Sequence, residues 1–174
     1  VQEFPKDTLA LSKTAKDYGT PVTIVDTVVR SNNKRKKSMA QRIVAACGGS
    51  VKGKTIAILG LTFKPNTDDM RESPSLVIIP ELQKLGASIR AYDPEGMEEA
   101  RRFLKKVTYC TDAYDCMTGA NAAVVVTEWD EFRALDIKRT EKLLSDQVFV
   151  DLRNIYPKDE LAGSKLKYSS IGRP

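Results

Sequence analysis

The stretch TIAILGLTFKPNTDDMRESPSL (55–76) joins two apolar runs through a strongly charged segment. Its first five residues are apolar at nearly every position, as in strands that are covered on both faces of a sheet. The segment that follows holds five charged residues within nine positions, namely Lys64, Asp68, Asp69, Arg71 and Glu72. In open parallel sheets, ligands bind beyond the carboxyl ends of the strands. We therefore expect residues 60–73 to form a loop that carries a site.

Short β-rich runs alternate with helix candidates along the rest of the chain. After KTIAILGL (54–61), the runs are ASIRAYD (87–93), KVTYC (106–110), NAAVVVT (121–127), QVFVDL (147–152) and KYSSI (167–171). The helix candidates are 74–85, 96–106, 113–119, 137–144 and 157–162. This alternation predicts the α/β class, with a doubly wound, mostly parallel, Rossmann-like sheet.

Residues 1–47 have a different pattern, which is helical. One short helix is expected to open at Asp7 and to end at Gly19, and a second to begin after Pro21. The apolar positions of the second helix follow three-and-four spacing, but its middle, RSNNKRKKS (30–38), is polar on every side. Such helices often bridge domains or subunits, so we expect a homodimer through helix 22–47. The Gly-rich segment 47–53 predicts two parts, a helical segment 1–47 and an α/β domain 48–174.

The composition excludes several kinds of site and partner. The 174 residues contain no histidine, which rules out His-based catalysis and His metal ligands within this chain. The cysteines Cys47, Cys110 and Cys116 lack metal-type spacing, so we expect reduced, partly buried thiols and no metal site. No apolar run approaches the roughly 20 residues of a membrane helix, and no signal peptide opens the chain. We expect a cytoplasmic protein without a membrane partner.

A net charge of +5 mildly favours anionic ligands. The basic run KRKK (34–37) lies in the middle of the second helix and has no aromatic residues interleaved with it. We therefore interpret it as a solvated or interface face rather than a nucleic-acid patch, and we expect no nucleic-acid partner.

The charged loop 60–73 has a functional and a plain interpretation. Ser73 and Pro74 form a helix start, whose N–H groups would be offered to an anion. Lys64 and Arg71 would add cationic donors, and Phe63 would stack on a planar base. In the plain alternative, the loop is a solvated surface loop with internal ion pairs. The loop lacks the G-x-G-x-x-G pattern of dinucleotide sites.

Two other strand ends carry charged residues. Arg153, after the run 147–152, would hold a phosphate in a bidentate manner or close its turn through a salt bridge with Asp151. Asp93, at the end of the run 87–93, would hold a ribose or build a simple turn, and the following Pro94 favours the turn. Trp129 is expected to pack near the edge of the sheet.

The segment GLTFKPNTDDMRESPSL (60–76) resembles the substrate loop of the UDP-glucose/GDP-mannose dehydrogenase family. Four more segments resemble that family in the same order, namely FPKDTLAL (4–11), the helix 22–47, VFVDLRNIY (148–156) and YSSIGRP (168–174). The resemblance implies a central dimerisation helix followed by a C-terminal UDP-sugar-binding domain. The family's NAD domain has no counterpart, and Glu3 stands where its cysteine nucleophile would be. We expect the native sequence to begin at Phe4, with residues 1–3 foreign to it.

The resemblance also assigns roles to individual residues. Asp7 would orient the water that attacks a thioester, although it also suits a helix N-cap. Phe63 and Lys64 would contact the UDP moiety, and Arg153 would bind the UDP-sugar. Arg71 would reach NAD, with Lys6 as a further cofactor contact.

The family reaction oxidises the C6 alcohol of a nucleotide sugar to a carboxylate, with two hydride transfers to NAD. The loop most resembles members that act on UDP-glucose, with UDP-N-acetylmannosamine and GDP-mannose as alternatives. Because so much of the machinery is missing, we expect the chain alone to be inactive. The competing hypothesis is a stand-alone nucleotide-sugar-binding module without catalysis.

Overall fold

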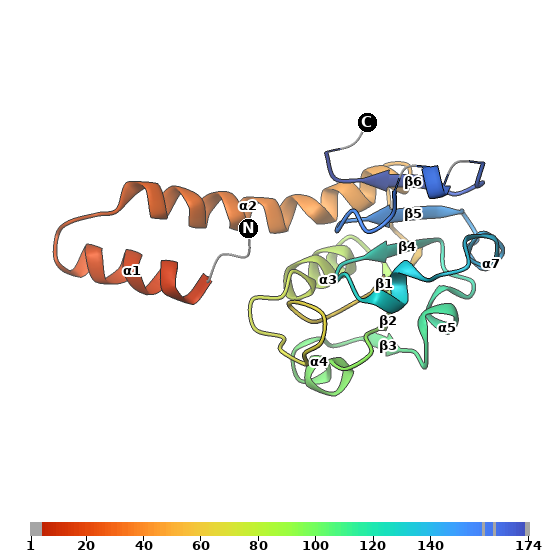
Figure 1. The fold of residues 1–174 in the computed structure, drawn as a ribbon, viewed down its shortest axis with the longest axis horizontal. Coiled ribbons are helices and arrows are strands. Elements are labelled where there is room, and N and C mark those ends of the chain that lie inside the picture. The colour runs from red at the N-terminus through yellow and green to blue at the C-terminus, as the bar shows by residue number, and fades with distance from the viewer. Residues whose placement is uncertain (1–4, 158, 162, 173–174) are drawn as a thin grey trace. The chain divides into compact units, whose positions relative to one another are not determined.

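The computed structural model describes residues 5–157, 159–161 and 163–172, and the chain divides into two compact units between Ser38 and Met39. The N-terminal unit holds α1 (Pro5–Asp17) and the first part of α2 (Thr23–Ala46). The second unit begins with the last turns of α2 and carries the sheet (Figure 1). The predicted boundary at 47/48 lies further along the chain, because these last turns pack on the sheet through Ala40 and Ile43.

The N-terminal unit is a pair of helices joined by a tight turn. Gly19 has φ +70, and the Thr20 N–H donates to the Ala15 carbonyl at 2.9 Å, which ends α1 as the glycine predicted. The Asp26 carboxylate of α2 accepts a hydrogen bond from Ser12 and pairs with Lys16 at 3.4 Å. These contacts fix the two helices to each other inside this unit.

The sheet of the second unit has six parallel strands in the order β3-β2-β1-β4-β5-β6. The strands are β1 (Thr55–Leu59), β2 (Ser88–Tyr92), β3 (Val107–Tyr109), β4 (Ala122–Val125), β5 (Val148–Asp151) and β6 (Lys167–Ser170). Each lies within a predicted run, and the predicted doubly wound sheet is confirmed. It is parallel throughout.

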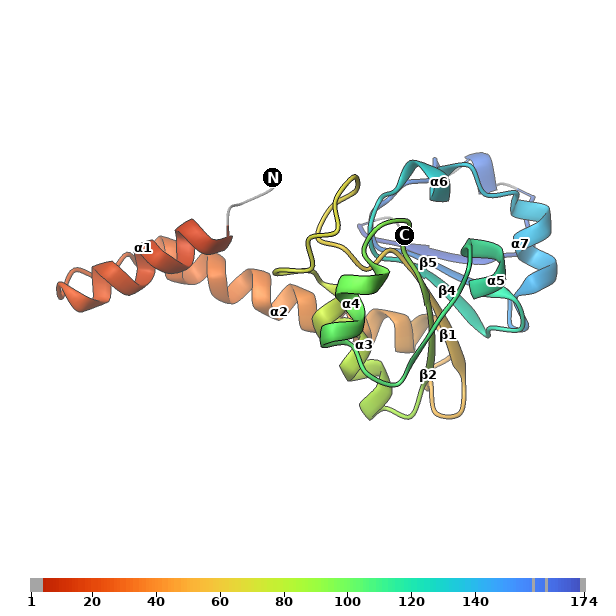
Figure 2. The ribbon, with the colours of Figure 1, turned by 90° about the horizontal axis from the view of Figure 1, so that it is seen from below.

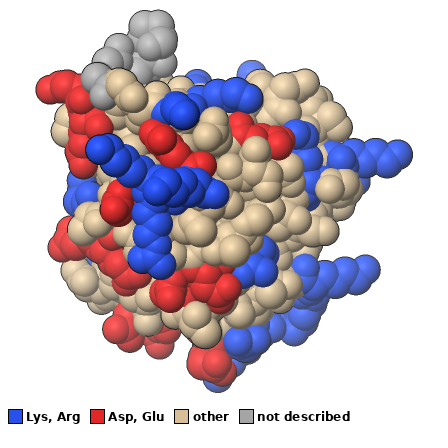
Figure 3. Space-filling view, turned by 90° about the vertical axis from the view of Figure 1, so that its right-hand side faces the viewer, with Lys and Arg blue, Asp and Glu red and all other residues tan. Residues whose placement is uncertain are grey.

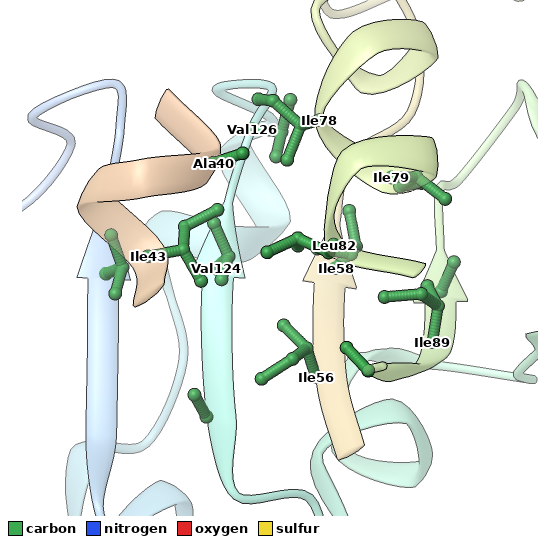
Figure 4. Packing of buried hydrophobic residues seen from close by; sticks show 14 of the residues in the cluster. Ala40, Ile43, Ile56, Ile58, Ile78, Ile79, Leu82, Ile89, Val124 and Val126 are labelled. Carbon is green, nitrogen blue, oxygen red and sulfur yellow. The ribbon is translucent and has the colours of Figure 1, made fainter. Parts of the chain in front are cut away.

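Helices cover both faces of the sheet. Figure 2 shows α3 (Ser75–Lys84) and α4 (Met97–Phe103) on one side, and α5 (Ala113–Met117), α6 (Asp130–Arg133) and α7 (Ile137–Leu143) on the other. A short 3₁₀ turn, η1 (Asp159–Leu161), adds its Leu161 to the core on the α5–α7 side. The consecutive apolar positions of β1 follow from this layering. Ile56 and Ile58 pack toward α3 (Figure 4), and Ala57 and Leu59 belong to the cluster on the opposite face.

Some helices differ in length from the sequence predictions, and one helix was not predicted. The helix expected over 96–106 ends at Phe103, because Leu104 is extended and Lys106 takes φ 54. The helix expected over 157–162 is only the turn η1 in the described residues. The one-turn helix α6 was not predicted, since four residues carry no periodic signal. Among the described residues, no helix is long and apolar enough to cross a membrane.

Candidate functional site

The strand order reverses between β1 and β4, which is where open α/β sheets bind ligands. The loop 60–73 follows β1, the segment 126–129 follows β4, and the loop 152–156 follows β5. Because all strands are parallel, these three segments lie at one edge of the sheet, the carboxyl edge (Figure 1). The polar residues of this edge form two groups, a buried group and an exposed group.

The buried group is centred on Asp93, whose side chain has no solvent exposure. Its Oδ2 accepts hydrogen bonds from the backbone N–H groups of Leu61 and Thr62 at 2.6 and 3.1 Å, and from the Trp129 indole at 3.1 Å. The Thr62 hydroxyl donates to the same oxygen, and the Gly96 N–H donates to Oδ1 at 2.7 Å. Asp93 therefore ties together the ends of β1, β2 and β4. Its turn interpretation is confirmed, because both oxygens are already used within the protein.

Trp129 packs close to the carboxyl edge of the sheet, as expected. It follows the central strand β4 and contributes its side chain to the core cluster on the α5–α7 side. Its indole N–H reaches Asp93, which gives a buried aromatic ring the polar partner it needs.

Gly60 allows the loop after β1 to approach the segment after β4. It has φ +90, and a Cβ at this position would lie 2.5 Å from the Cβ of Thr127. The Thr127 hydroxyl donates to the Thr62 carbonyl at 2.6 Å. A side chain larger than that of glycine would therefore separate the two loops.

At the start of α3, the polar groups form hydrogen bonds within the protein. The hydroxyls of Ser73 and Ser75 both donate to the Leu61 carbonyl at 2.6 Å. The Ser75 N–H donates to the Ser73 hydroxyl at 3.2 Å, and the Leu76 N–H donates to the Ser73 carbonyl. The N-cap of α3 is Pro74, one residue later than predicted, and it makes no side-chain cap hydrogen bond. The expectation that this helix start offers free N–H groups to an anion is wrong, because those groups have partners inside the protein.

We call the exposed group the rim. It consists of the exposed residues Lys64, Arg71 and Arg153, together with the half-buried Phe63. In the loop 60–73, Phe63 is half-buried and its N–H donates to the Asp69 carbonyl at 2.8 Å, which closes the loop. Lys64 is exposed and forms no ion pair with another described residue. Its ammonium is therefore available to a ligand.

Arg71 forms a bidentate ion pair with Asp69. Its Nε donates to Oδ1 at 2.8 Å and its Nη2 pairs with Oδ2 at 2.7 Å. These hydrogen bonds raise the pKa of Arg71 above its usual range. The internal ion pair expected in the plain interpretation is present, yet 67% of the Arg71 side chain remains exposed.

At the carboxyl end of β5, Asp151 and Arg153 have different roles. The buried Asp151 accepts hydrogen bonds from the Arg153 N–H at 2.9 Å and the Tyr168 hydroxyl at 2.8 Å, so its carboxylate shapes the turn. The Arg153 guanidinium pairs with Glu128, in the segment after β4, at 2.5 Å. The salt bridge considered for Arg153 exists, but its partner is Glu128 rather than Asp151.

The sequence analysis did not predict that Glu128 is the partner of Arg153. The available signal was an acidic residue directly after the apolar run 121–127, at the carboxyl end of a central strand.

The two N-terminal candidates belong to the other unit. Asp7 is exposed in the first turn of α1, and Lys6 precedes it, with a side chain outside the described part. Glu3 and Phe4 also lie outside the described residues.

Other groups in the described residues form no chemical centre. The three cysteines are buried free thiols, as expected, and no cluster of His, Cys, Asp or Glu suited to a metal is found there. Figure 3 views the molecule from the right-hand side of Figure 1, and on this face basic and acidic side chains lie next to each other.

Comparisons with known proteins agree on one family. Residues 57–158 match the description "UDP-glucose/GDP-mannose dehydrogenase family, UDP binding domain". The chain is 52% identical, over 98% of its length, to a UDP-glucose 6-dehydrogenase of Rhizobium meliloti, and 41% identical to UDP-glucose 6-dehydrogenase TuaD of Bacillus subtilis. It spans 39% and 37% of the lengths of these two relatives.

Solved structures are similar over nearly the whole chain. A UDP-glucose dehydrogenase from Pyrobaculum islandicum superimposes with a TM-score of 0.79 at 30% identity, covering 95% of this chain and 36% of that one. An NDP-N-acetyl-D-galactosaminuronic acid dehydrogenase from Methanosarcina mazei has a TM-score of 0.76 at 26% identity, covering 86% of this chain and 32% of that one.

Proposed function

Because this chain belongs to the UDP-glucose/GDP-mannose dehydrogenase family, we propose that it is the C-terminal part of a UDP-glucose 6-dehydrogenase. In this proposal, the whole enzyme oxidises UDP-glucose to UDP-glucuronate with NAD, and the present chain binds the UDP-sugar. The observation that carries the proposal is the 52% identity to the Rhizobium meliloti enzyme along 98% of the chain.

The rim supports the binding of a nucleoside diphosphate. Lys64 and Arg153 are cationic residues on two different loops at the carboxyl edge of the sheet, after β1 and after β5. A guanidinium matches the planar arrangement of phosphate oxygens, and an ammonium acts on phosphate as a point charge. Phe63, next to Lys64 in the sequence and half-buried, would supply an aromatic ring for stacking on the uracil ring.

The catalytic roles are proposed on the same family ground. Asp7 orients the water that hydrolyses the thioester, and Arg71 and Lys6 contact NAD. The guanidinium of Arg71 remains largely exposed beside Asp69, and a guanidinium suits a phosphate of the dinucleotide. NAD accepts the two hydrides of the reaction. The sequence contains no G-x-G-x-x-G, so NAD is held mainly by residues outside this chain.

The chain alone is therefore expected to be inactive. Incubation with UDP-glucose and NAD should give no increase in NADH absorbance above the rate without protein. Sustained NADH formation by this chain, in a preparation free of longer dehydrogenases, would contradict the proposed division of labour.

Dimerisation through helix 22–47 is also part of the proposal. Among the described residues of the N-terminal unit, large apolar side chains are exposed at Ile24 of this helix and at Leu9, Leu11 and Tyr18 before it, and such residues on two copies would be buried by association. Analytical ultracentrifugation should give twice the mass of the chain. Ile24→Asp should shift the distribution toward monomer, whereas Lys165→Asp, in an exposed loop of the other unit, should not.

Titration calorimetry tests the binding proposal. The unaltered chain should bind UDP, and Arg153→Ala should weaken that binding by roughly 10- to 100-fold, the range of a charge-assisted hydrogen bond. Lys165→Ala is the matched control, since this exposed lysine precedes β6 at the opposite edge of the sheet. Equal UDP affinity of Arg153→Ala and the unaltered chain would contradict the assignment of the rim.

A further inference from the structure

Glu128 has a feature that no other described side chain shares. One carboxylate oxygen, Oε1, accepts a hydrogen bond from Arg153 Nη2 at 2.5 Å. The other oxygen, Oε2, is buried and has no hydrogen-bond partner among the described residues. A buried acceptor without a donor lowers the stability of the fold, and a buried negative charge needs a positive partner. The Glu128 carboxylate therefore depends on its ion pair with Arg153.

The backbone around Glu128 is fixed on both sides. The preceding Thr127 donates its hydroxyl to the Thr62 carbonyl at 2.6 Å, and the following Trp129 donates its indole N–H to Asp93 at 3.1 Å. Glu128 itself is only 22% exposed. Its carboxylate therefore has little freedom to follow Arg153 if the arginine moves.

The backbone around Arg153 is fixed as well. Its N–H donates to Asp151, and the next residue, Asn154, takes the left-handed conformation with φ 55. The Asn154 side chain makes two hydrogen bonds of 3.0 Å with the backbone of Ile171. The side chain of Arg153 is thus the part of this loop that still needs an anchor, and Glu128 provides one.

We propose that Glu128 is a positioning residue, which holds the Arg153 guanidinium in place for the diphosphate of a nucleotide sugar. This inference rests on the proposed function. Glu128 engages Nη2, and the other guanidinium N–H groups form no hydrogen bond with described residues, so they are left to face phosphate oxygens. Residues that orient a ligand-binding group from behind commonly contribute 10- to 100-fold to affinity at metal sites, and the same reasoning applies to a fixed arginine.

Two ligands separate positioning from a general structural effect. Glu128→Gln keeps the shape of the side chain and removes its charge. We expect roughly tenfold weaker UDP binding by this variant. Uridine, which has no phosphate for Arg153 to contact, should bind the variant and the unaltered chain equally, and the melting temperature should change little. Glu131→Gln is the matched control, an exposed glutamate of α6, and it should leave both affinities unchanged.

The dependence on Arg153 is tested by a double-variant cycle. In an Arg153→Ala background, Glu128→Gln should cause no further loss of UDP affinity, because the group it positions is gone. Undiminished UDP affinity of Glu128→Gln, or equal losses for UDP and uridine, would overturn the inference while leaving the proposed function intact. Absence of UDP binding by the unaltered chain would overturn both.

Discussion

The carboxyl edge of the sheet holds two sets of polar residues that differ in what surrounds them. Asp93, Thr62 and Ser73 are buried, and their polar atoms are bonded to the protein. Lys64 and Arg153 lie on the same loops or neighbouring ones, but they are exposed and retain donors for a ligand. The comparison teaches that a charged residue at the end of a parallel strand is not in itself a ligand-binding residue. The buried set builds the loops, and the rim uses the positions that those loops provide.

The largest effect is expected from Asp93→Ala, which should destabilise the fold. The change leaves buried N–H donors of Leu61, Gly96 and Trp129 without an acceptor. Each such loss costs about 1–3 kcal/mol, so the free energy of unfolding should fall by at least about 3 kcal/mol. Urea unfolding followed by circular dichroism measures it. Asp130→Ala is the control, since the Asp130 side chain is 99% exposed, and a similar loss for both variants would break the comparison.

Gly60→Ala should have the next largest effect. Gly60 and Gly119 both have positive φ, but a Cβ on Gly60 would meet Thr127 at 2.5 Å, whereas one on Gly119 would meet nothing within 4 Å. Gly119→Ala should cost about 1–2 kcal/mol from backbone strain alone. Gly60→Ala should cost more than that, through the added clash, and thermal unfolding can compare the two. Equal melting temperatures would show that the two loops do not need their close approach.

A smaller effect, on binding alone, is expected from Lys64→Ala. Removal of one exposed ammonium should weaken UDP binding by roughly tenfold, about 1.4 kcal/mol, with the melting temperature nearly unchanged. The loss should shrink as salt is added, because exposed charges are screened. Calorimetry at two salt concentrations measures the loss of UDP affinity and its dependence on salt. If the variant unfolds more easily but binds UDP normally, Lys64 stabilises the loop, as the residues of the buried group do, and does not bind the ligand.

The smallest effect is expected from Arg71→Ala. The Arg71–Asp69 pair is largely exposed, and such pairs contribute about 0–1 kcal/mol to stability. UDP affinity of this chain should change by less than about twofold, because the proposed role of Arg71 concerns NAD. A tenfold loss of UDP affinity would instead place Arg71 among the UDP-binding residues.

The fold was predictable because its signals are local. Apolar runs of strand length, separated by helical segments, identified all six strands and the main helices. Short elements without periodicity, such as α6, and helix ends set by a single φ, as at Lys106, leave no comparable trace in the sequence.

The candidate site was predictable only in outline. Motif and position selected Lys64, Arg71 and Arg153, and the structure brings their loops to one edge. Whether a polar group is left free depends on contacts between distant segments. One such contact is the pair of hydrogen bonds from the Ser73 and Ser75 hydroxyls to the Leu61 carbonyl. Another is the ion pair between Glu128 and Arg153. Spacing along the chain does not contain that information.

The most direct test of the central claim is a titration of the ¹⁵N-labelled chain with UDP, followed by the shifts of its backbone amide signals. We predict the largest changes in the loop 60–73 and at Arg153 and Glu128, with signals of the loop 163–166, at the opposite edge, unchanged. Changes concentrated at that opposite edge, or UDP binding that leaves both rim loops unaffected, would contradict the account.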